Sequence, residues 1–381
     1  MSSEKPLMLV APGQGDSDWL YACGFDVEQA LYFDFGGGDR VLVVPELEFE
    51  RAKAESHVGQ VVDRREAGWV ESKDLIGAWS AVAAHVLRQR GIDGVRISPR
   101  LPVGYYQALE AADVTMEVDA ELFRERRRRK SREEASFIHA AQRAAEAACA
   151  EIIAHLAVSE IRDGRLWLDD RPLTSQRLMA RAESALAEIG YTGSHMIVAG
   201  SPDNALPHYR GEGQLRANAP IIIDIFPRGM TSGYRGDLTR TVVVGEVSEQ
   251  VRRMWEASLE AFEAAVSMLK AGVNGRDVHL AACKLLVERG FGTYTKGYEG
   301  NAEGPRMSHS LGHGVGLDVH EAPSLRDLDY PLLAGDVVTI EPGLYLKGVG
   351  GVRVEDTGII TADGFHNFTT LPKSLDPKAY L

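Results

Sequence analysis

Residues 221–244, IIIDIFPRGMTSGYRGDLTRTVVV, contain two apolar runs on either side of a turn-forming segment. Asp224 lies within the first run, and Asp237 lies at the start of the second. A carboxylate inside an apolar strand costs free energy unless it is paired or binds a cation. If this stretch folds as a hairpin about Met230 and Thr231, the two acids lie opposite each other with Cβ atoms about 4.5–5.5 Å apart. Two like charges so placed repel each other unless a divalent metal ion lies between them.

A second pair of acids follows the same plan near the C-terminus. Glu341 ends the apolar run in residues 338–343, VTIEPG, and Glu355 lies in residues 351–356, GVRVED. The intervening residues 347–351, KGVGG, predict a turn centred on Gly348. Two hairpins therefore deliver four carboxylates that need cations.

A histidine-rich segment, residues 308–321 (SHSLGHGVGLDVHE), holds three of the eleven histidines of the chain. Glycines on both sides of His313 let the backbone approach a site closely. Four carboxylates and one imidazole suit Mn²⁺, Fe²⁺, Co²⁺ or Zn²⁺ and favour the harder Mn²⁺. A single acid or histidine of this kind is more often an ordinary core residue, so the prediction rests on the five together. Two such ions a few ångström apart can hold a bridging hydroxide and stabilise a tetrahedral intermediate.

The composition is that of a globular protein, with 44% hydrophobic and 25% charged residues among 381, which excludes collagen, coiled coil and wholesale disorder. The net charge of −13 disfavours nucleic acid and anionic membranes as partners. Three widely spaced cysteines support neither a disulfide framework nor a zinc knuckle. Residues 1–6, MSSEKP, lack the pattern of a signal peptide, and apolar runs stay well below the ~20 residues of a membrane span. We therefore expect a cytoplasmic protein.

The pattern of elements changes near residue 124. Residues 1–123 alternate short apolar runs with helical stretches, which predicts a small α/β domain, whereas residues 124–381 predict an α+β domain with helices and antiparallel hairpins. We interpret the basic run RERRRRKSREE, residues 124–134, as a solvated linker that leads into a helix capped by Ser131. Helices are expected at 46–56, 75–91, 131–155, 177–190, 248–272 and 277–290, and strands at 40–45, 94–98, 221–226, 239–244, 336–341 and 351–360.

Four short motifs, DLTRT (237–241), SLGHGVGLDVHE (310–321), TIEPGLY (339–345) and GVRVEDTG (351–358), carry a family resemblance. In their order and spacing the chain resembles the pita-bread metallopeptidases, and within them the Xaa-Pro peptidases, prolidase and aminopeptidase P. The resemblance covers about residues 124–375. It extends more weakly to WLYACGF (19–25) and RVLVVPELEFERA (40–52), which are similar to the creatinase/prolidase-type N-terminal domain. It implies a pita-bread (creatinase/aminopeptidase) catalytic domain at 124–381 after a smaller domain at 1–123.

The resemblance also implies the metal ligands. Asp224 and Asp237 would bind two divalent ions, with Asp237 and Glu355 bridging both. His313 and Glu341 would each complete the shell of one ion, and Glu341 would also take a proton from the bridging water.

Further histidines and arginines match active-site positions of the family. His208 matches a substrate-binding histidine, and His320 matches the histidine that donates to the scissile carbonyl and steadies the oxyanion. His309 matches a further active-site histidine, and Arg353 an arginine that supports the ligands. Arg326 lies near the place where prolidases keep an arginine for the free carboxylate of the substrate.

The expected function is hydrolysis of the peptide bond before proline by a dimetal-bound hydroxide, in an Xaa-Pro dipeptidase rather than an aminopeptidase P. The expected cofactor is two divalent ions, Mn²⁺ with Co²⁺ or Zn²⁺ as alternatives. The expected substrates are proline-containing dipeptides or short peptides, and the resemblance implies a homodimer. Two other functions stay open, namely a hydrolase of another small amide on the same scaffold and a binding protein that needs no metal.

Overall fold

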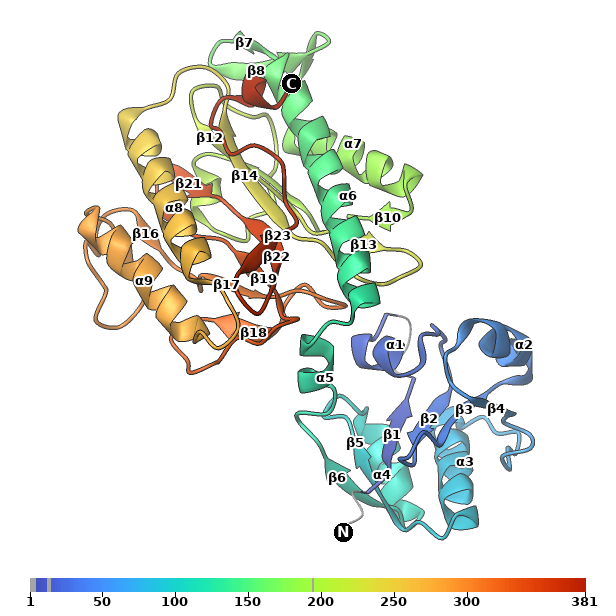
Figure 1. The fold of residues 1–381 in the computed structure, drawn as a ribbon. Helices are drawn as coiled ribbons and strands as arrows, with labels where there is room; N and C mark the ends of the chain where they lie inside the picture. The colour runs from blue at the N-terminus through green and yellow to red at the C-terminus, as the bar shows by residue number, and fades with distance from the viewer. Residues whose placement is uncertain (1–4, 12–14, 194) are drawn as a thin grey trace. The chain divides into compact units, whose positions relative to one another are not determined.

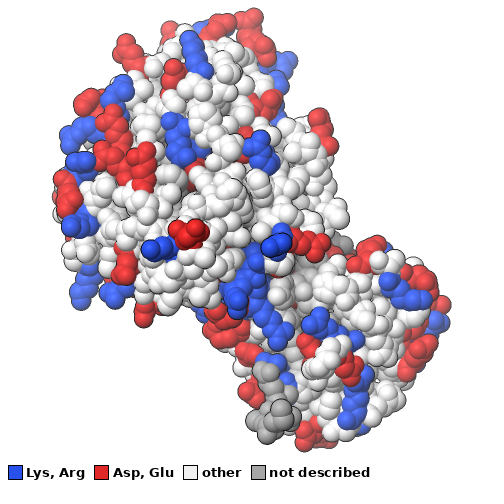
Figure 2. Space-filling view, in the orientation of Figure 1, with Lys and Arg blue, Asp and Glu red and all other residues white. Residues whose placement is uncertain are grey.

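The computed structural model describes residues 5–11, 15–193 and 195–381 (Figure 1). Residues 1–4, part of the segment in which the sequence predicts no signal peptide, lie outside this description. The chain divides into two compact units, Met1–Glu125 and Arg126–Leu381. Among the described helices, none is both long and apolar enough to cross a membrane. Acidic and basic side chains are largely interspersed over the face shown in Figure 2.

The N-terminal unit is a mixed six-stranded sheet in the order β4-β3-β2-β1-β5-β6 with helices on both faces. Alternate strand residues bury opposite faces: Met8, Phe33 and Val43 pack in one apolar cluster, and Leu9 and Leu42 in another. The α/β character expected for this unit is confirmed. Its elements are β1 (Leu7–Val10), α1 (Ser17–Cys23), β2 (Leu31–Asp34), β3 (Arg40–Val44), α2 (Glu46–Glu55), β4 (Gln60–Asp63), α3 (Leu75–Gln89), β5 (Gly94–Ile97), α4 (Val103–Ala111) and β6 (Thr115–Val118).

The larger unit has four long helices at the expected places. The longest, α6, begins with a capping box in which the Ser131 side chain accepts from the Glu134 amide and the Glu134 carboxylate accepts from the Ser131 amide. A short helix, α5 (Arg124–Arg128), precedes it. The long helices are α6 (Arg132–Ala157), α7 (Ser175–Glu188), α8 (Glu249–Met268) and α9 (Gly275–Glu288).

Several small antiparallel sheets complete the larger unit, and they pack on the helices through two apolar cores. One core joins α6 and α7 to the sheet β11-β12-β14, and the other joins α8 and α9 to the C-terminal strands. The strands and 3₁₀ helices are β7 (Glu160–Arg162), β8 (Arg165–Leu168), β9 (Arg171–Pro172), β10 (Tyr191–Thr192), β11 (Ile197–Gly200), η1 (Asp203–Ala205), β12 (Pro220–Ile225), β13 (Arg228–Gly229), β14 (Leu238–Val243), β15 (Gly292–Thr293), β16 (Arg306–Met307), β17 (Gly312–Gly314), β18 (Glu321–Leu325), β19 (Val337–Ile340), β20 (Gly343–Leu346), β21 (Gly350–Arg353), β22 (Asp356–Ile360), β23 (Phe365–Asn367) and η2 (Pro377–Tyr380).

The first acidic hairpin forms, but its expected register is wrong by two residues. Asp224 on β12 pairs with Thr239 on β14, so Asp237 lies just before the strand rather than opposite Asp224. The turn is displaced because Gly233 adopts a φ of +75°, and the Gly229 amide donates to the Tyr234 carbonyl at 2.9 Å. Asp237 and Thr239 are two residues apart. Because successive side chains along a strand point to opposite faces, these two point to the same face.

The second acidic hairpin has the expected register. Gly343 pairs with Arg353 in one sheet and Ile340 pairs with Asp356 in the next, which is the register that places Glu341 opposite Glu355. The expected single strand over 351–360 is wrong, however, because it divides into β21 and β22 in two different sheets. The first strand of this hairpin is also interrupted, at Glu341 and Pro342, because proline has no amide hydrogen to donate to a neighbouring strand. Both acids therefore lie where the chain passes from one sheet to another.

The interpretation of residues 124–134 as a solvated linker is wrong for three of its cations. Arg127, Arg128 and Lys130 are buried, with 5–8% of their surface exposed. Burying a cation is costly unless it is paired, and each of these three has a carboxylate partner in the larger unit.

Candidate metal centre

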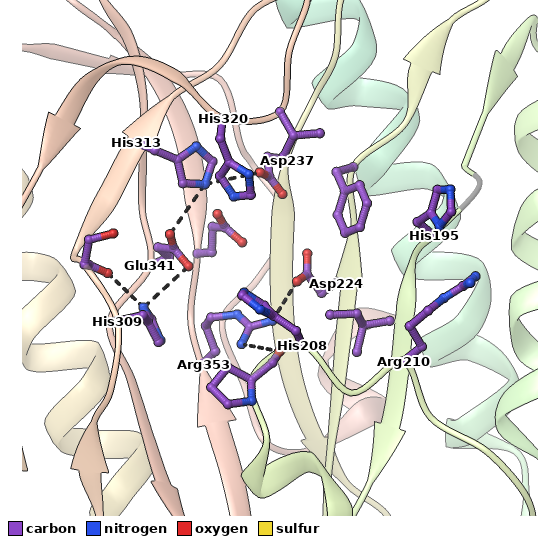
Figure 3. A pocket seen from close by; sticks show the side chains of 16 residues that line it. His195, His208, Arg210, Asp224, Asp237, His309, His313, His320, Glu341 and Arg353 are labelled. Carbon is purple, nitrogen blue, oxygen red and sulfur yellow. Dashed lines mark hydrogen bonds and ion pairs between the residues drawn. The ribbon is translucent and has the colours of Figure 1, made fainter.

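The larger unit contains a cavity of about 570 Å³ lined by the acidic hairpins and the histidine-rich segment (Figure 3). The structure brings together all five side chains that the sequence predicts as ligands, which are Asp224, Asp237, His313, Glu341 and Glu355. Four further predicted site residues line the same cavity, namely His208, His309, His320 and Arg353.

Three of these side chains form a compact group of metal-binding atoms. One ligand atom each from Asp237, His313 and Glu355 lies within 4.8 Å of the others. His313 Nε2 lies 3.7 Å from Asp237 Oδ2 and 3.5 Å from Glu341 Oε1. Carboxylate oxygens and an imidazole nitrogen pointing at one another without direct hydrogen bonds can hold a divalent cation.

The backbone around Asp237 is fixed by helix α6. Gln142 on this helix accepts from the Asp237 amide and donates to the Asp237 carbonyl, both at 2.8 Å. This approach requires glycine at 236, because a Cβ there would lie 2.6 Å from the backbone of Ala141. The contact between the residues before β14 and helix α6 therefore holds the Asp237 carboxylate at the cavity.

Arg353 neutralises part of the acidic charge from below the cavity (Figure 3). Its Nη2 donates to Asp224 Oδ2 at 2.6 Å, and its Nε donates to the Thr239 hydroxyl at 3.1 Å. The Thr239 hydroxyl in turn donates to Glu355 Oε2 at 2.6 Å. The other oxygen of Asp224, Oδ1, is buried without a hydrogen-bond partner among the described residues, as expected of an oxygen that binds a cation.

Burial and repulsion between carboxylates make Asp237, Glu341 and Glu355 bind protons more tightly than usual. Burial, with repulsion from Asp224 and Glu341, raises the pKa of Asp237 well above its usual range. Burial likewise raises the pKa of Glu355, with repulsion from Asp237 adding to it. Burial raises the pKa of Glu341 to about 8 although Arg353 opposes the shift. A bound cation would compensate the negative charge that these carboxylates carry when they are ionised.

The histidines are held neutral, as ligands must be. Burial, followed by repulsion from His320, lowers the pKa of His313 to about 3. Burial also lowers the pKa of His309 to about 3, and its Nε2 lies 2.8 Å from the Tyr345 hydroxyl. The rings of His313 and His320 meet edge to face with centroids 4.2 Å apart.

The sequence prediction of Arg326 at the cavity has no support in this geometry, because Arg326 is exposed just beyond β18 and outside the described lining. Conversely, the sequence analysis missed His195 and Arg210, which line the cavity on the side opposite His309, His313 and Glu341 (Figure 3). Arg210 follows His208 by two residues, a proximity that could have drawn attention to it.

The comparisons with known proteins agree with this geometry. Metallopeptidase family M24 matches residues 136–362, which include all five predicted ligands. The chain belongs to this family. It is 31% identical over 352 residues to a protein named Xaa-Pro dipeptidase from Pyrococcus horikoshii, covering 90% of this chain and 88% of that protein.

Two solved structures share the fold over almost the whole chain. The prolidase of Pyrococcus horikoshii is 27% identical with a TM-score of 0.78, covering 98% of this chain and 96% of that one. The X-Pro aminopeptidase of Thermotoga maritima is 25% identical with a TM-score of 0.79, covering 97% of each chain. The α+β pita-bread fold with a smaller α/β domain before it is therefore confirmed. Membership of family M24 makes this chain a metallopeptidase that uses divalent metal ions.

The raised carboxyl pKa values predict how the metal-free protein responds to pH. In the unfolded chain these groups titrate near pH 4, so between pH 5 and 8 the folded state binds more protons and its stability falls as pH rises. From pH 6.5 to 8.5, Glu341 alone is expected to lower the free energy of unfolding by about 2 kcal/mol. Urea unfolding of chelator-treated protein at both pH values measures this change. Glu341→Gln should show a smaller drop than the wild type, and Asp237 and Glu355 should account for what is left of it. An unfolding free energy that stays flat or rises in the wild type contradicts the prediction.

Proposed function

We propose that this metallopeptidase is an Xaa-Pro dipeptidase that hydrolyses the bond before proline. The observation that carries the proposal is the convergence of the five acidic and imidazole donors in one cavity that is also lined by His208 and His320. The Xaa-Pro dipeptidase name of a relative at 31% identity over most of both chains supports the same substrate class.

We propose that Asp224, Asp237, His313, Glu341 and Glu355 are the residues that would hold two divalent ions. The unpartnered Asp224 oxygen, the compact Asp237–His313–Glu355 group and the raised carboxyl pKa values support this assignment. When bound, the ions supply Lewis acidity that lowers the pKa of water and polarises a carbonyl group. Four oxygen donors and one nitrogen favour Mn²⁺, with Co²⁺ or Zn²⁺ as alternatives.

The protein's own groups would handle protons and the substrate. The Glu341 carboxylate, which binds protons more tightly than an ordinary glutamate, takes the proton of the attacking water and passes it to the proline nitrogen. His320 donates from its imidazole to the carbonyl oxygen as negative charge develops there. His208 also lines the cavity and would bind the substrate. His309 and Arg353 act through Tyr345 and Asp224, which they hydrogen bond.

The choice between a dipeptidase and an aminopeptidase depends on what binds the carboxylate of proline. Arg210 is the cavity-lining guanidinium that is free for this, because it has no ion pair or side-chain hydrogen bond within the described part of the chain. Its backbone is fixed, since its carbonyl accepts from the Val198 amide at 2.9 Å. Gly211, with a φ of +96°, has no room for a Cβ against the Val198 carbonyl. A guanidinium at the cavity, on a backbone held in this way, would favour substrates that end at proline.

The location and assembly of the enzyme stay predictions. All three cysteines are buried and unpaired, which supports a reducing compartment such as the cytoplasm. The homodimer is implied by the family resemblance, and sedimentation of the purified protein would test it.

Activity and metal content test the proposal directly. Protein loaded with Mn²⁺ should contain about two equivalents of metal by elemental analysis and should cleave Ala-Pro faster than Ala-Pro-Ala. Chelation should abolish activity, and re-addition of Mn²⁺ should restore it. A protein that ignores both peptides but opens another small amide would be the alternative hydrolase, and one that binds no metal would be the alternative binding protein.

Removing the imidazole at 320 separates catalysis from metal binding. His320→Ala should keep two equivalents of metal and lower kcat for Ala-Pro by roughly 10²–10³, the usual effect of losing one oxyanion donor. The matched control is His366→Ala, an exposed histidine on β23 outside the cavity lining. An unchanged kcat in His320→Ala would show that the oxyanion is stabilised by other groups.

The two candidate arginines can be compared directly. Arg210→Ala should lower kcat/KM for Ala-Pro by about 10- to 100-fold, the effect of one charge-assisted hydrogen bond, and should hardly affect Ala-Pro amide, which lacks the carboxylate. Arg326→Ala should leave both substrates unchanged. If instead Arg326→Ala lowers kcat/KM for Ala-Pro and Arg210→Ala does not, Arg326 is the residue that binds the substrate carboxylate. If Arg210→Ala lowers kcat/KM equally for both substrates, Arg210 does not bind the carboxylate.

A further inference from the structure

Two buried cations of the basic run bind the acids on either side of His320. Arg127 Nη2 lies 2.6 Å from Asp318 Oδ2 and 2.6 Å from Glu321 Oε2. Lys130 Nζ lies 2.6 Å from the other oxygen of Glu321, Oε1. The two cations and the two acids form what we call the 127–130 clamp, and His320 is the residue directly before Glu321.

Burial makes these contacts strong. The Arg127 side chain is 7% exposed, that of Glu321 8%, and that of Lys130 is fully buried. Charged groups in such surroundings interact more strongly than they do in water, and removing one partner leaves the other uncompensated. Both oxygens of Glu321 have a cation, so the carboxylate is fixed in position and in orientation.

The turn before His320 is built around this carboxylate. Gly316 lies against it, and a Cβ at this position would be 2.3 Å from Glu321 Oε1. The Gly316 amide donates to the Asp318 carbonyl at 3.1 Å, and the Gly316 carbonyl accepts from the Arg235 amide at 2.9 Å. On the other side, Glu321 begins β18 and pairs with Gly314. The backbone of His320 is thus held from both directions.

The ring of His320, in contrast, has little to orient it. In the described part of the chain its nitrogens have no hydrogen-bond partner, and its defined ring contact is the edge-to-face packing on His313 at 4.2 Å. Ring position therefore depends on where the backbone puts the Cα–Cβ bond. An error of about 1 Å at a catalytic group can cost about 10²-fold in rate.

We infer that Arg127 and Lys130, near the start of the larger unit, are positioning residues for His320. The inference rests on the proposed role of His320. It assigns to the basic run a task that a solvated linker would not have, which is to hold the residues on either side of the carbonyl-binding imidazole.

A double-mutant cycle tests the inference with Mn²⁺-loaded protein and Ala-Pro. Arg127→Met should lower kcat by about 10- to 100-fold while KM changes far less and metal content stays at the wild-type level. In the His320→Ala background the same substitution should cause almost no further loss, because its target is gone. Arg127→Lys, which keeps the charge but not the forked contact with two acids, should restore part of kcat.

Arg128→Met is the matched control. Arg128 belongs to the same run, is equally buried and pairs with Asp336 at 2.7 Å, away from residues 318–321. Arg128→Met should change kcat by the same factor in the wild-type and His320→Ala backgrounds. This should hold even if the Arg128→Met protein has a lower thermal stability.

Additive effects of Arg127→Met and His320→Ala would overturn the inference and leave the clamp as a stabilising contact. If Arg127→Met does not fold, Asp318→Asn replaces it in the same cycle, since the Asp318 side chain is 34% exposed and tolerates the change more easily. Failure of the proposed function would be seen separately, as a wild type that does not cleave Ala-Pro or a His320→Ala variant with unchanged kcat.

Discussion

The hydrogen bond from Arg353 to Asp224, at 2.6 Å, lies in a cavity that also contains the carboxylates of Asp237, Glu341 and Glu355. One guanidinium cannot balance four acids, and burial makes their repulsion stronger. The surrounding fold holds the acids together nonetheless. Two strand pairs bring them from distant parts of the chain, and two apolar cores around α6–α9 fix those strands. The arrangement becomes favourable when cations enter.

Much of this could be predicted from sequence, because the decisive signals are local. An acid within or beside an apolar run, repeated in two hairpins of similar length, indicates cations regardless of the rest of the fold. The glycines at 348 and on both sides of His313 mark a turn and a close approach. The long helices follow from caps such as Ser131 and Glu134, which act within one turn.

The remainder depends on contacts between residues far apart in the chain. The register of the first hairpin is set by the left-handed conformation of Gly233, which the sequence alone does not distinguish from that of its neighbours. The buried state of Arg127 depends on acids nearly 200 positions later, and a run of arginines gives no sign of them. Arg210 lies at the cavity, and its carbonyl accepts a hydrogen bond from the amide of Val198, twelve residues earlier in the chain.

The division of the chain after Glu125 keeps Arg127 and Lys130 in the same unit as the acids that they bind. Ser131, the cap of α6, looks like the natural first residue of an independent catalytic domain, yet a domain that started there would lack both cations that compensate Glu321. If N-terminal domains are exchanged among related enzymes in the course of evolution, the crossover that preserves catalysis lies upstream of Arg127. The four residues from 127 to 130 then travel with the catalytic domain and vary together with Asp318 and Glu321.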